Sequence, residues 1–583
     1  MSKKILGVAL AALMLLIVAL PAGAQIQVTS LDVRGEVYDN QSNFPVLGTS
    51  GTGWDAFNFA GFWYDLKEGL QSESLNITAA NTTAILLNGN RNITKQMVFY
   101  NTTRQFVRYK VNDANQSNNF VEKGLDATGT KQTSGVAGTH YAKLGWFAEP
   151  YVALNGKANK LAKLIIEQGS SSSEKKSLTV GETWDIGDGW TLTAQSIDAK
   201  ATPRQAWLVL SKDGVKKDDK VIAQGQVYTY IEKSIAGESD VPLFVTYVDS
   251  VFAGATSDMV QLRYTWAVST SITEVKSADK YGILKVTDDG SSLGTIVLWN
   301  EDNSISLSTD ATIDIGGNMK FKVADNSSYL RFYPMVTIKT PGTYEVRGEV
   351  YSNGSHYPAI GTNSSLGTGW TAFNFAGFWY DLKEGLQSES LNINAANTTS
   401  ILVAGNRNIS KQMVFYNTTR QFVRYKVNDA NQSNNFVEKG LDASGTKQTS
   451  GVAGTHYAKL GWFAEPYVAM NGKSNKLAKL IIEQGSSSSD KKSLTVGETW
   501  DIGDGWTLTA QSIDAKATPR QAWLVLSKDG VKKDDKVIAQ GQVYTYIEKS
   551  IAGESDVPLF VTYVDSVFAG ATSDMVQLRY TWA

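Results

Sequence analysis

The 583-residue sequence contains no cysteine, three histidines and eleven prolines. Without cysteine there is no disulfide framework and no thiol nucleophile, so a fold outside the cytosol must rely on burial of apolar surface. So few histidines cannot supply paired-histidine metal motifs, and HExxH does not occur. We therefore expect a protein that is not an enzyme, with no catalytic residues, no metal ligands and no cofactor.

The chain also lacks a dominant charge. It has 55 Lys and Arg against 57 Asp and Glu, a net charge of −2, and no long block of one sign. Nucleic-acid-binding proteins normally carry a basic face, so nucleic acid is not an expected partner.

Long apolar runs are absent except at the N-terminus. Two lysines precede an apolar run over residues 5–20, and a proline and small residues follow at 21–24. This order is typical of a secretory signal peptide, and the run is shorter than the ~20 residues of a spanning helix, which is the alternative interpretation. We predict cleavage before Gln25, an extracellular mature protein and no membrane span in this chain. Other envelope proteins would then anchor it.

The sequence is dominated by an internal repeat. Residues 54–267 recur as 370–583 with ten substitutions in 214 aligned positions. Residues 268–345, the closing segment, follow the first copy only. We predict three parts, namely a signal peptide (1–24), a first repeat (25–345) and a second repeat without a closing segment (346–583).

Short apolar or alternating runs separated by turn residues predict many strands. An Asp-Gly pair at 213–214 predicts a tight hairpin. Helical periodicity is weak, and the best helix candidates are residues 63–70 and 250–255. We predict an all-β tandem repeat in which each copy is a pair of β-sandwich domains with short connecting helices. The expected strands include residues 191–196, 206–210, 226–231, 242–248, 259–266, 295–299, 319–323 and 330–333.

A faint internal echo supports two sandwiches per copy. TWDIG at 183–187 and TIDIG at 312–316 both lie between strand-like stretches. A common turn sequence is an equally good explanation.

Sequons for N-glycosylation crowd the first third of each copy, which favours glycan-bearing loops facing solvent in an exported chain. The alternative is that Asn, Ser and Thr are simply abundant in β loops. The candidates are Asn40, Asn76, Asn81, Asn92, Asn101, Asn115, Asn326, Asn353, Asn363, Asn397, Asn408, Asn417 and Asn431.

An aromatic block, FNFAGFWYD, occupies residues 57–65 and recurs at 373–381. Such a cluster could stack on sugar rings, but aromatic blocks are more often core or interface anchors. The candidate interface residues are Phe57, Phe62, Trp63, Tyr64, Phe373, Phe378, Trp379 and Tyr380.

Acidic pairs occur at 185 and 188, 218 and 219, and 288 and 289, none with EF-hand spacing. Loosely bound Ca²⁺ is conceivable at such loops, although turns of this composition are common without metal. His140 and His456 occupy one repeated site, and no triad partners are evident for either.

Several motifs together resemble the S-layer tandem-repeat family of methanogenic (Methanosarcina-type) archaea. They are FNFAGFWYDL at 57–66, GETWDIG at 181–187, DVPLFV at 240–245, RYTW at 263–266, and KFKVAD with LRFYP at 320–334. The resemblance implies paired β-sandwich domains and a two-dimensional glycoprotein lattice with small pores. Members of that family usually end in a polar linker and a membrane helix, which this sequence does not show.

We therefore predict a structural subunit of a cell-surface S-layer that self-assembles into a porous lattice, acting as a protective coat and molecular sieve. The alternative is a secreted adhesin or carbohydrate-binding β-sandwich protein. A surface hydrolase using His140 is a third hypothesis.

Overall fold

The computed structural model divides the chain into two compact units, 1–357 and 358–583. It describes residues 25–28, 30–45, 52–78, 90–114, 121–133, 135–169, 171–254, 256–339, 342–352, 355–358, 367–394, 407–409, 411–430, 437–485, 490–570 and 573–583. The predicted signal peptide lies outside the described residues.

The all-β prediction is confirmed, and all the expected strands are present. Both helix candidates are wrong: residues 64–71 form a hairpin, and residues 250–252 belong to a long strand. The hairpin forms because Asp65 Oδ1 accepts hydrogen bonds from the backbone N–H groups of Lys67 and Glu68, at 2.9 and 3.0 Å, which fixes a turn. The helical elements are short 3-10 turns, η1 (Lys110–Asp113), η2 (Leu154–Gly156), η3 (Ser172–Glu174), η5 (Lys426–Asp429) and η6 (Met470–Gly472).

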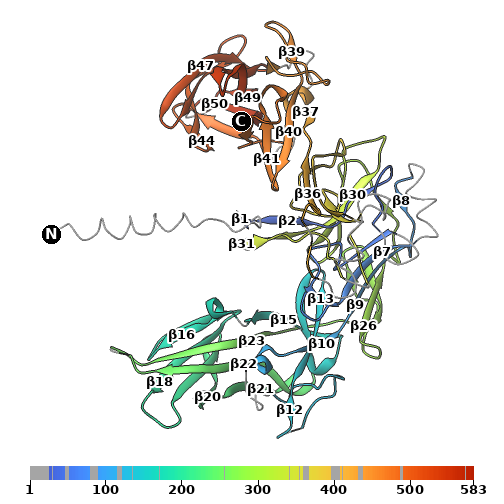
Figure 1. The fold of residues 1–583 in the computed structure, drawn as a ribbon, viewed down its shortest axis with the longest axis vertical. Helices are drawn as coiled ribbons and strands as arrows, with labels where there is room; N and C mark the ends of the chain where they lie inside the picture. Colours follow the sequence, from blue (N-terminus) through green and yellow to red (C-terminus); the bar gives the residue numbers. More distant parts are fainter. Residues whose placement is uncertain are drawn as a thin grey trace, which may run out of the picture. The chain divides into compact units, whose positions relative to one another are not determined.

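The first sandwich of copy 1 is built from both ends of the repeat, because strands of the closing segment pair with strands from residues 31–103 (Figure 1). One sheet has the order β24 (Lys280–Tyr281), β25 (Leu284–Asp289), β26 (Thr295–Trp299), β9 (Val98–Thr103), β7 (Glu73–Ile77), β4 (Thr52–Asp55). The other is β2 (Leu31–Arg34), β30 (Arg331–Ile338), β29 (Met319–Val323), β28 (Thr312–Gly316), with β3 (Tyr38–Asp39) on β30. Trp54, Phe321 and Phe332 pack between them.

The second sandwich is the middle of the repeat, and its core joins two sheets through Trp190, Leu208 and Phe244. The larger sheet is β10 (Gln105–Arg108), β13 (His140–Trp146), β14 (Glu149–Ala153), β15 (Lys160–Glu167), β23 (Met259–Glu274), β22 (Glu238–Phe252), β21 (Val227–Ile235), with β16 (Lys176–Thr179) on β23. The smaller is β17 (Thr183–Gly187), β18 (Trp190–Asp198), β19 (Gln205–Lys212), β20 (Val215–Ala223). Short pairs are β1 (Gln25–Val28) with β31 (Gly342–Glu345), β5 (Tyr64–Asp65) with β6 (Leu70–Gln71), β8 (Asn92–Ile93) with β27 (Ile305–Ser306), and β11 (Val121–Glu122) with β12 (Ala137–Gly138).

Local sequence sets two recurring features. Asp213 and Gly214 have φ of 52° and 76°, as a two-residue hairpin between β19 and β20 requires. The TWDIG and TIDIG strands, β17 and β28, each open a hairpin with the same register and the same irregularity before the final glycine. The echo in the sequence is therefore also a structural one.

The second copy repeats the middle of the first but not its closure. Its sheets are β32 (Gly367–Thr371), β35 (Glu389–Asn394), β36 (Val414–Thr418); β37 (Gln421–Arg424), β40 (His456–Trp462), β41 (Glu465–Ala469), β42 (Leu477–Lys479); β43 (Lys492–Thr495), β50 (Met575–Trp582), β49 (Glu554–Phe568), β48 (Val543–Ile551); and β44 (Thr499–Gly503), β45 (Trp506–Asp514), β46 (Gln521–Lys528), β47 (Val531–Ala539). Short pairs are β33 (Tyr380–Asp381) with β34 (Leu386–Gln387), and β38 (Val437–Glu438) with β39 (Ala453–Gly454).

One identical stretch shows how context sets strand length. KLAKLIIE forms all eight residues of β15 in copy 1, but only three residues of its counterpart form β42 in copy 2. β15 pairs with β23, which continues to Glu274, whereas β50 stops at Trp582. Strand formation here depends on the partner strand rather than on intrinsic propensity.

We predict opposite outcomes for one substitution made in the two copies. Phe147 is 2 % exposed, and its counterpart Phe463 is 63 % exposed. Phe147→Ala should lower the free energy of unfolding by about 3–5 kcal/mol because it empties a packed site, whereas Phe463→Ala should cost below about 1 kcal/mol. Urea unfolding of the two variants checks this. Equal losses would contradict the different burial of the two sites.

Candidate functional site

The aromatic block divides its side chains among different neighbours. Phe59 and Phe62 point into the first sandwich and are buried, with ring centroids 4.7 Å apart. Gly61 permits this packing, since a Cβ there would lie 2.7 Å from the Phe59 ring. The block is thus partly core, and Phe378 of the second copy is buried in the same way.

Trp63 faces a charged pair of the larger sheet. The Lys143 ammonium lies 4.7 Å from the Trp63 ring centroid and donates a 2.7 Å hydrogen bond to Glu167 Oε2. Both charges are largely buried, so their pairing is required to offset desolvation. The second copy repeats the arrangement, with the Lys459 ammonium 4.8 Å from the Trp379 ring centroid.

Phe57 and Tyr64 contact the head segment, which we define as residues 347–352 and 355–357 at the start of the second repeat. The Phe57 ring stacks on His356, with centroids 4.5 Å apart and planes 2° apart. Val350 N donates to Phe57 O at 3.0 Å, and Arg347 Nη2 donates to the carbonyls of Phe59 and Phe62 at 3.2 and 3.1 Å. The block of copy 1 therefore holds the beginning of copy 2.

Two glutamates from the two repeats meet at this junction. Glu36 and Glu349 occupy the same place in the sequence RGEVY, which begins at 34 and again at 347. Glu36 Oε1 accepts from Asn43 Nδ2 at 3.0 Å, and Glu349 Oε1 lies 2.6 Å from His356 Nε2. His356 stands where Asn43 stands in the first repeat, so a polar partner has been exchanged for a titratable one.

The pKa of Glu36 is raised to about 8, mainly by burial and then by the charge of Glu349, while hydrogen bonds from Asn43 and Asn58 act in the opposite direction. Burial also lowers the pKa of Arg347 to about 10 and raises that of Asp55. The sequence analysis missed this group of acids. The repeated RGEVY and the Asn-to-His exchange were the available signals.

A second buried acid supports the first sandwich. Glu73 Oε1 accepts hydrogen bonds from Tyr100 Oη and Ala148 N, both at 2.8 Å, and burial raises the pKa of Glu73 to about 7. Gly145 is required beside it, because a Cβ there would overlap the Glu73 carboxylate.

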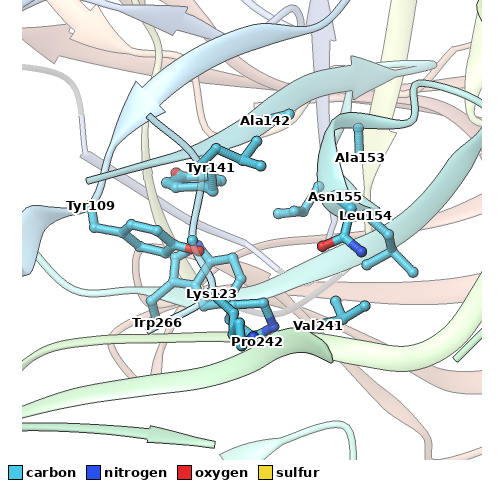
Figure 2. A pocket seen from close by; sticks show the side chains of 13 residues that line it. Tyr109, Lys123, Tyr141, Ala142, Ala153, Leu154, Asn155, Val241, Pro242 and Trp266 are labelled. Atoms are coloured by element: carbon cyan, nitrogen blue, oxygen red, sulfur yellow. The ribbon is translucent and has the colours of Figure 1, made fainter. Parts of the chain in front are cut away.

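The pocket shown in Figure 2 offers no room for a substrate. Tyr109, Tyr141, Trp266 and Pro242 line it, and its volume is about 20 Å³, enough for about one water. A larger cleft of about 390 Å³ runs beside β14 and β30. Three of its polar groups pair with one another, since Glu149 bonds both Lys163 and Asn318 at 2.9 Å.

Carboxylates of the predicted acidic pairs accept hydrogen bonds within turns and between strands. Asp185 and Asp288 accept backbone N–H bonds within their own turns, and Asp219 accepts from Trp207 Nε1 at 2.8 Å. Within the part of the chain that the structure describes, no group of three or more His, Asp or Glu side chains is placed to hold a metal ion. Weak calcium binding stays a prediction.

The hydrolase hypothesis rests on His140, and the described residues near this histidine do not form a catalytic triad. His140 Nδ1 lies 2.7 Å from Thr139 Oγ1, and burial lowers the pKa of His140. Residues 290–294, GSSLG, match the spacing of a hydrolase nucleophile elbow, which the sequence analysis did not notice. They join β25 to β26 in an antiparallel hairpin, whereas an elbow leads from a strand into a helix.

The sequons fall into three groups. Asn92, Asn408 and Asn417 are exposed, whereas Asn40, Asn76, Asn101 and Asn326 are partly buried. The remaining six, Asn81, Asn115, Asn353, Asn363, Asn397 and Asn431, lie outside the described residues. Among the described residues, no helix is long or apolar enough to cross a membrane.

These features define a repeated β protein whose chemistry resides in its packed faces and surfaces. Comparison with known proteins agrees. A family model described as S-layer protein matches residues 43–325 and 360–583, and the chain belongs to this family. Its relatives include major S-layer proteins of Methanosarcina mazei and Methanosarcina barkeri, each 31 % identical over all of this chain and 77 % and 76 % of their own lengths. The Methanosarcina acetivorans protein is 30 % identical over all of this chain and 77 % of its own length. The resemblance seen in the sequence is confirmed, and the chain is a structural S-layer subunit of the cell surface.

The raised pKa of Glu36 predicts a specific pH dependence. Its pKa is about 8 when folded against 4.5 as the ordinary value, so its stabilising contribution is complete below about pH 4.5 and is lost as the pH rises through 8. Glu36→Gln keeps an uncharged acceptor. Relative to wild type, it should be near neutral at about pH 4.5 and more stable by several kcal/mol, on the order of 4, at about pH 8.5, measured by urea unfolding.

The exposed Glu68→Gln serves as the matched control and should leave the pH dependence unchanged. If Glu36→Gln behaved like Glu68→Gln, Glu36 would be ionised in the folded protein across this range.

Accessibility predicts which sequons carry glycan. Asn101 lies on β9 between β7 and β26, with a buried Oδ1, whereas its counterpart Asn417 is exposed. We expect glycan on Asn92, Asn408 and Asn417 but not on Asn101. Cleavage after arginine alone yields residues 92–104 and 408–420, which differ at position 94 or 410, so mass spectrometry can assign each site. Glycan on Asn101 would contradict the closed sheet.

Proposed function

We propose that the chain self-assembles into a porous two-dimensional glycoprotein lattice, which coats the cell and sieves molecules by size. The observation that carries the proposal is membership of the S-layer family over nearly the whole chain, combined with an almost exact internal duplication. A subunit with two near-identical copies can make the same contact twice, and repeated contacts build extended arrays.

A duplicated apolar patch supports lattice contacts between copies of this chain. Trp207 and Val221 are opposite each other on β19 and β20, and both are exposed. Trp523 and Val537 repeat the pair in the second copy with the same exposure. Tryptophan is enriched among residues that dominate binding at interfaces. The proposed contact adds to the candidate interface residues of the aromatic block, which stay a prediction.

The non-enzymatic role is part of the proposal. The small pocket of Figure 2 and the pairing of Glu149 with Lys163 and Asn318 in the larger cleft support a structural role over turnover. Sugar binding by the aromatic block is less favoured, because Phe57 already stacks on His356 and Phe62 is buried.

Electron microscopy of purified protein at high concentration tests the lattice. We expect periodic sheets from the wild type and loss of order in the double variant Trp207→Ser and Trp523→Ser, because both exposed rings would be removed from the contact. Circular dichroism should show that the variant keeps its fold, since the two rings lie outside the core.

The matched control is Val180→Ser with Val496→Ser, an exposed apolar pair elsewhere on the two copies. If the Trp207 and Trp523 variant formed sheets as regular as those of this control, a role of the patch in lattice contacts would be excluded. Wild-type protein that stays monomeric and binds polysaccharide would favour the adhesin alternative.

A further inference from the structure

One histidine of the chain lies at the joint between the two repeats and is not itself repeated. The other two histidines occupy one repeated site, whereas His356 stands where the first repeat has Asn43. His356 faces Asp55, since its charge opposes the rise in the pKa of Asp55 that burial causes. Asp55 has also been exchanged between the copies, because its counterpart is Thr371. Two exchanges therefore give this joint an acid from one repeat and a base from the other.

We propose that this joint is a proton-operated latch, in which the head segment is docked on the aromatic block of the first copy in acid and is released from it in alkaline solution. The proposal goes beyond lattice formation. It concerns a single chain by itself, so its failure would leave the proposed lattice untouched.

Hydrogen bonds and a ring stack hold the head segment on the aromatic block. Arg347 Nη2 donates to two backbone carbonyls of the block, and Val350 N donates to Phe57 O at 3.0 Å. The His356 ring lies parallel to the Phe57 ring, with centroids 4.5 Å apart. Each contact of this kind makes only a small net contribution to stability. A change of charge beside them can therefore decide whether the segment stays docked.

The charges around these contacts balance in only one protonation state. The titratable groups are Glu36, Asp55, Tyr64, Arg347, Glu349 and His356. When ionised, Asp55 and Glu349 contribute two negative charges, and Arg347 contributes one positive charge. A protonated His356 together with a neutral Glu36 brings the net charge to zero. A neutral His356 together with an ionised Glu36 leaves a net charge of −2.

Burial makes this uncompensated charge costly. The Glu349 side chain is only 8 % exposed, and Glu36 is fully buried beside it. Release of the head segment takes the Glu349 carboxylate away from Glu36 and admits water, so it stabilises the ionised form of Glu36. The docked form thus binds the proton of Glu36 more tightly than the released form does. Docking is therefore favoured in acid and weakens as the pH rises through the pKa of about 8.

His356 acts in the same direction as Glu36. Its Nε2 lies 2.6 Å from Glu349 Oε1, so a protonated imidazole pairs directly with this carboxylate. An imidazole is the side chain that most readily loses its charge near neutral pH, and this loss weakens the attraction to Glu349. Asn43 gives Glu36 a hydrogen bond in the first repeat without any charge. The exchange of Asn43 for His356 thus adds a response to pH.

Hydrogen exchange of the full chain tests the latch. Protection factors, which compare each rate with that of an unstructured peptide at the same pH, are measured at about pH 6 and about pH 9. Peptides that include Ser352 report on the head segment. We expect the protection of the Val350 amide to be lower by at least about 10-fold at the higher pH, because its hydrogen bond to Phe57 opens. β30 should stay protected at both pH values, which verifies that the first sandwich remains folded.

Two variants alter the latch in opposite ways. Glu36→Gln keeps the buried position neutral, so the protection of Val350 should agree within about twofold at the two pH values. His356→Asn restores the residue of the first repeat and should lower the protection at about pH 6, because the cation beside Glu349 is missing. The matched control, Glu68→Gln, changes an exposed glutamate and should respond to pH as the wild type does.

Three results would overturn the proposal. The first is equal protection of Val350 at both pH values in the wild type. The second is a Glu36→Gln variant whose protection falls as steeply as that of the wild type, because the controlling proton would then reside elsewhere. The third is a loss of protection in β30 together with the head segment, because the whole sandwich would then unfold.

Discussion

Closure of the first sandwich depends on one antiparallel contact, the pairing of β26 with β9. Thr103 and Thr295 pair directly, although the residues between them in the sequence form the whole second sandwich. The chain therefore leaves the first core, forms the second sandwich and then returns to complete the first. In a protein without disulfides, the apolar faces buried by that return supply the stability that cross-links provide elsewhere. Where the described chain has no returning strand, the same sequence leaves Phe463 and its neighbours exposed.

Local signals in the sequence predicted most strands, because alternation and turn chemistry act within a few residues. The hairpin at Asp213 follows from backbone preference alone. The helix expected at residues 63–70 fails because an Asp65 turn competes successfully with weak helical periodicity. The different strand lengths of KLAKLIIE in the two copies do not follow from its own residues, which are identical. They depend on the partner strand, which extends past Trp266 in the first copy and ends at Trp582 in the second.

The candidate site was predictable in part. The aromatic block stood out as a motif, and the burial of Phe59 and Phe62 agrees with the preference for a core role. Its role as an interface between subunits stays a prediction. The acids beside it did not stand out, because Glu36 and Glu349 are unremarkable locally and come together only when the head segment packs on Phe57. The raised pKa of Glu36 is a consequence of burial, which sequence alone does not report.

The differences between the two copies are concentrated where the repeats join. Asp55 becomes Thr371, and Asn43 becomes His356, and the charge of His356 acts on Asp55 across the junction. Each exchange by itself is a polar substitution of no obvious purpose, yet together they place an acid of one repeat beside a base of the next. By contrast, the Trp207 and Trp523 faces are unchanged. Duplication followed by divergence at the joint gives a subunit whose two halves connect in a fixed order while their outer faces stay the same, and that is what a tile needs in order to meet its neighbours repeatedly.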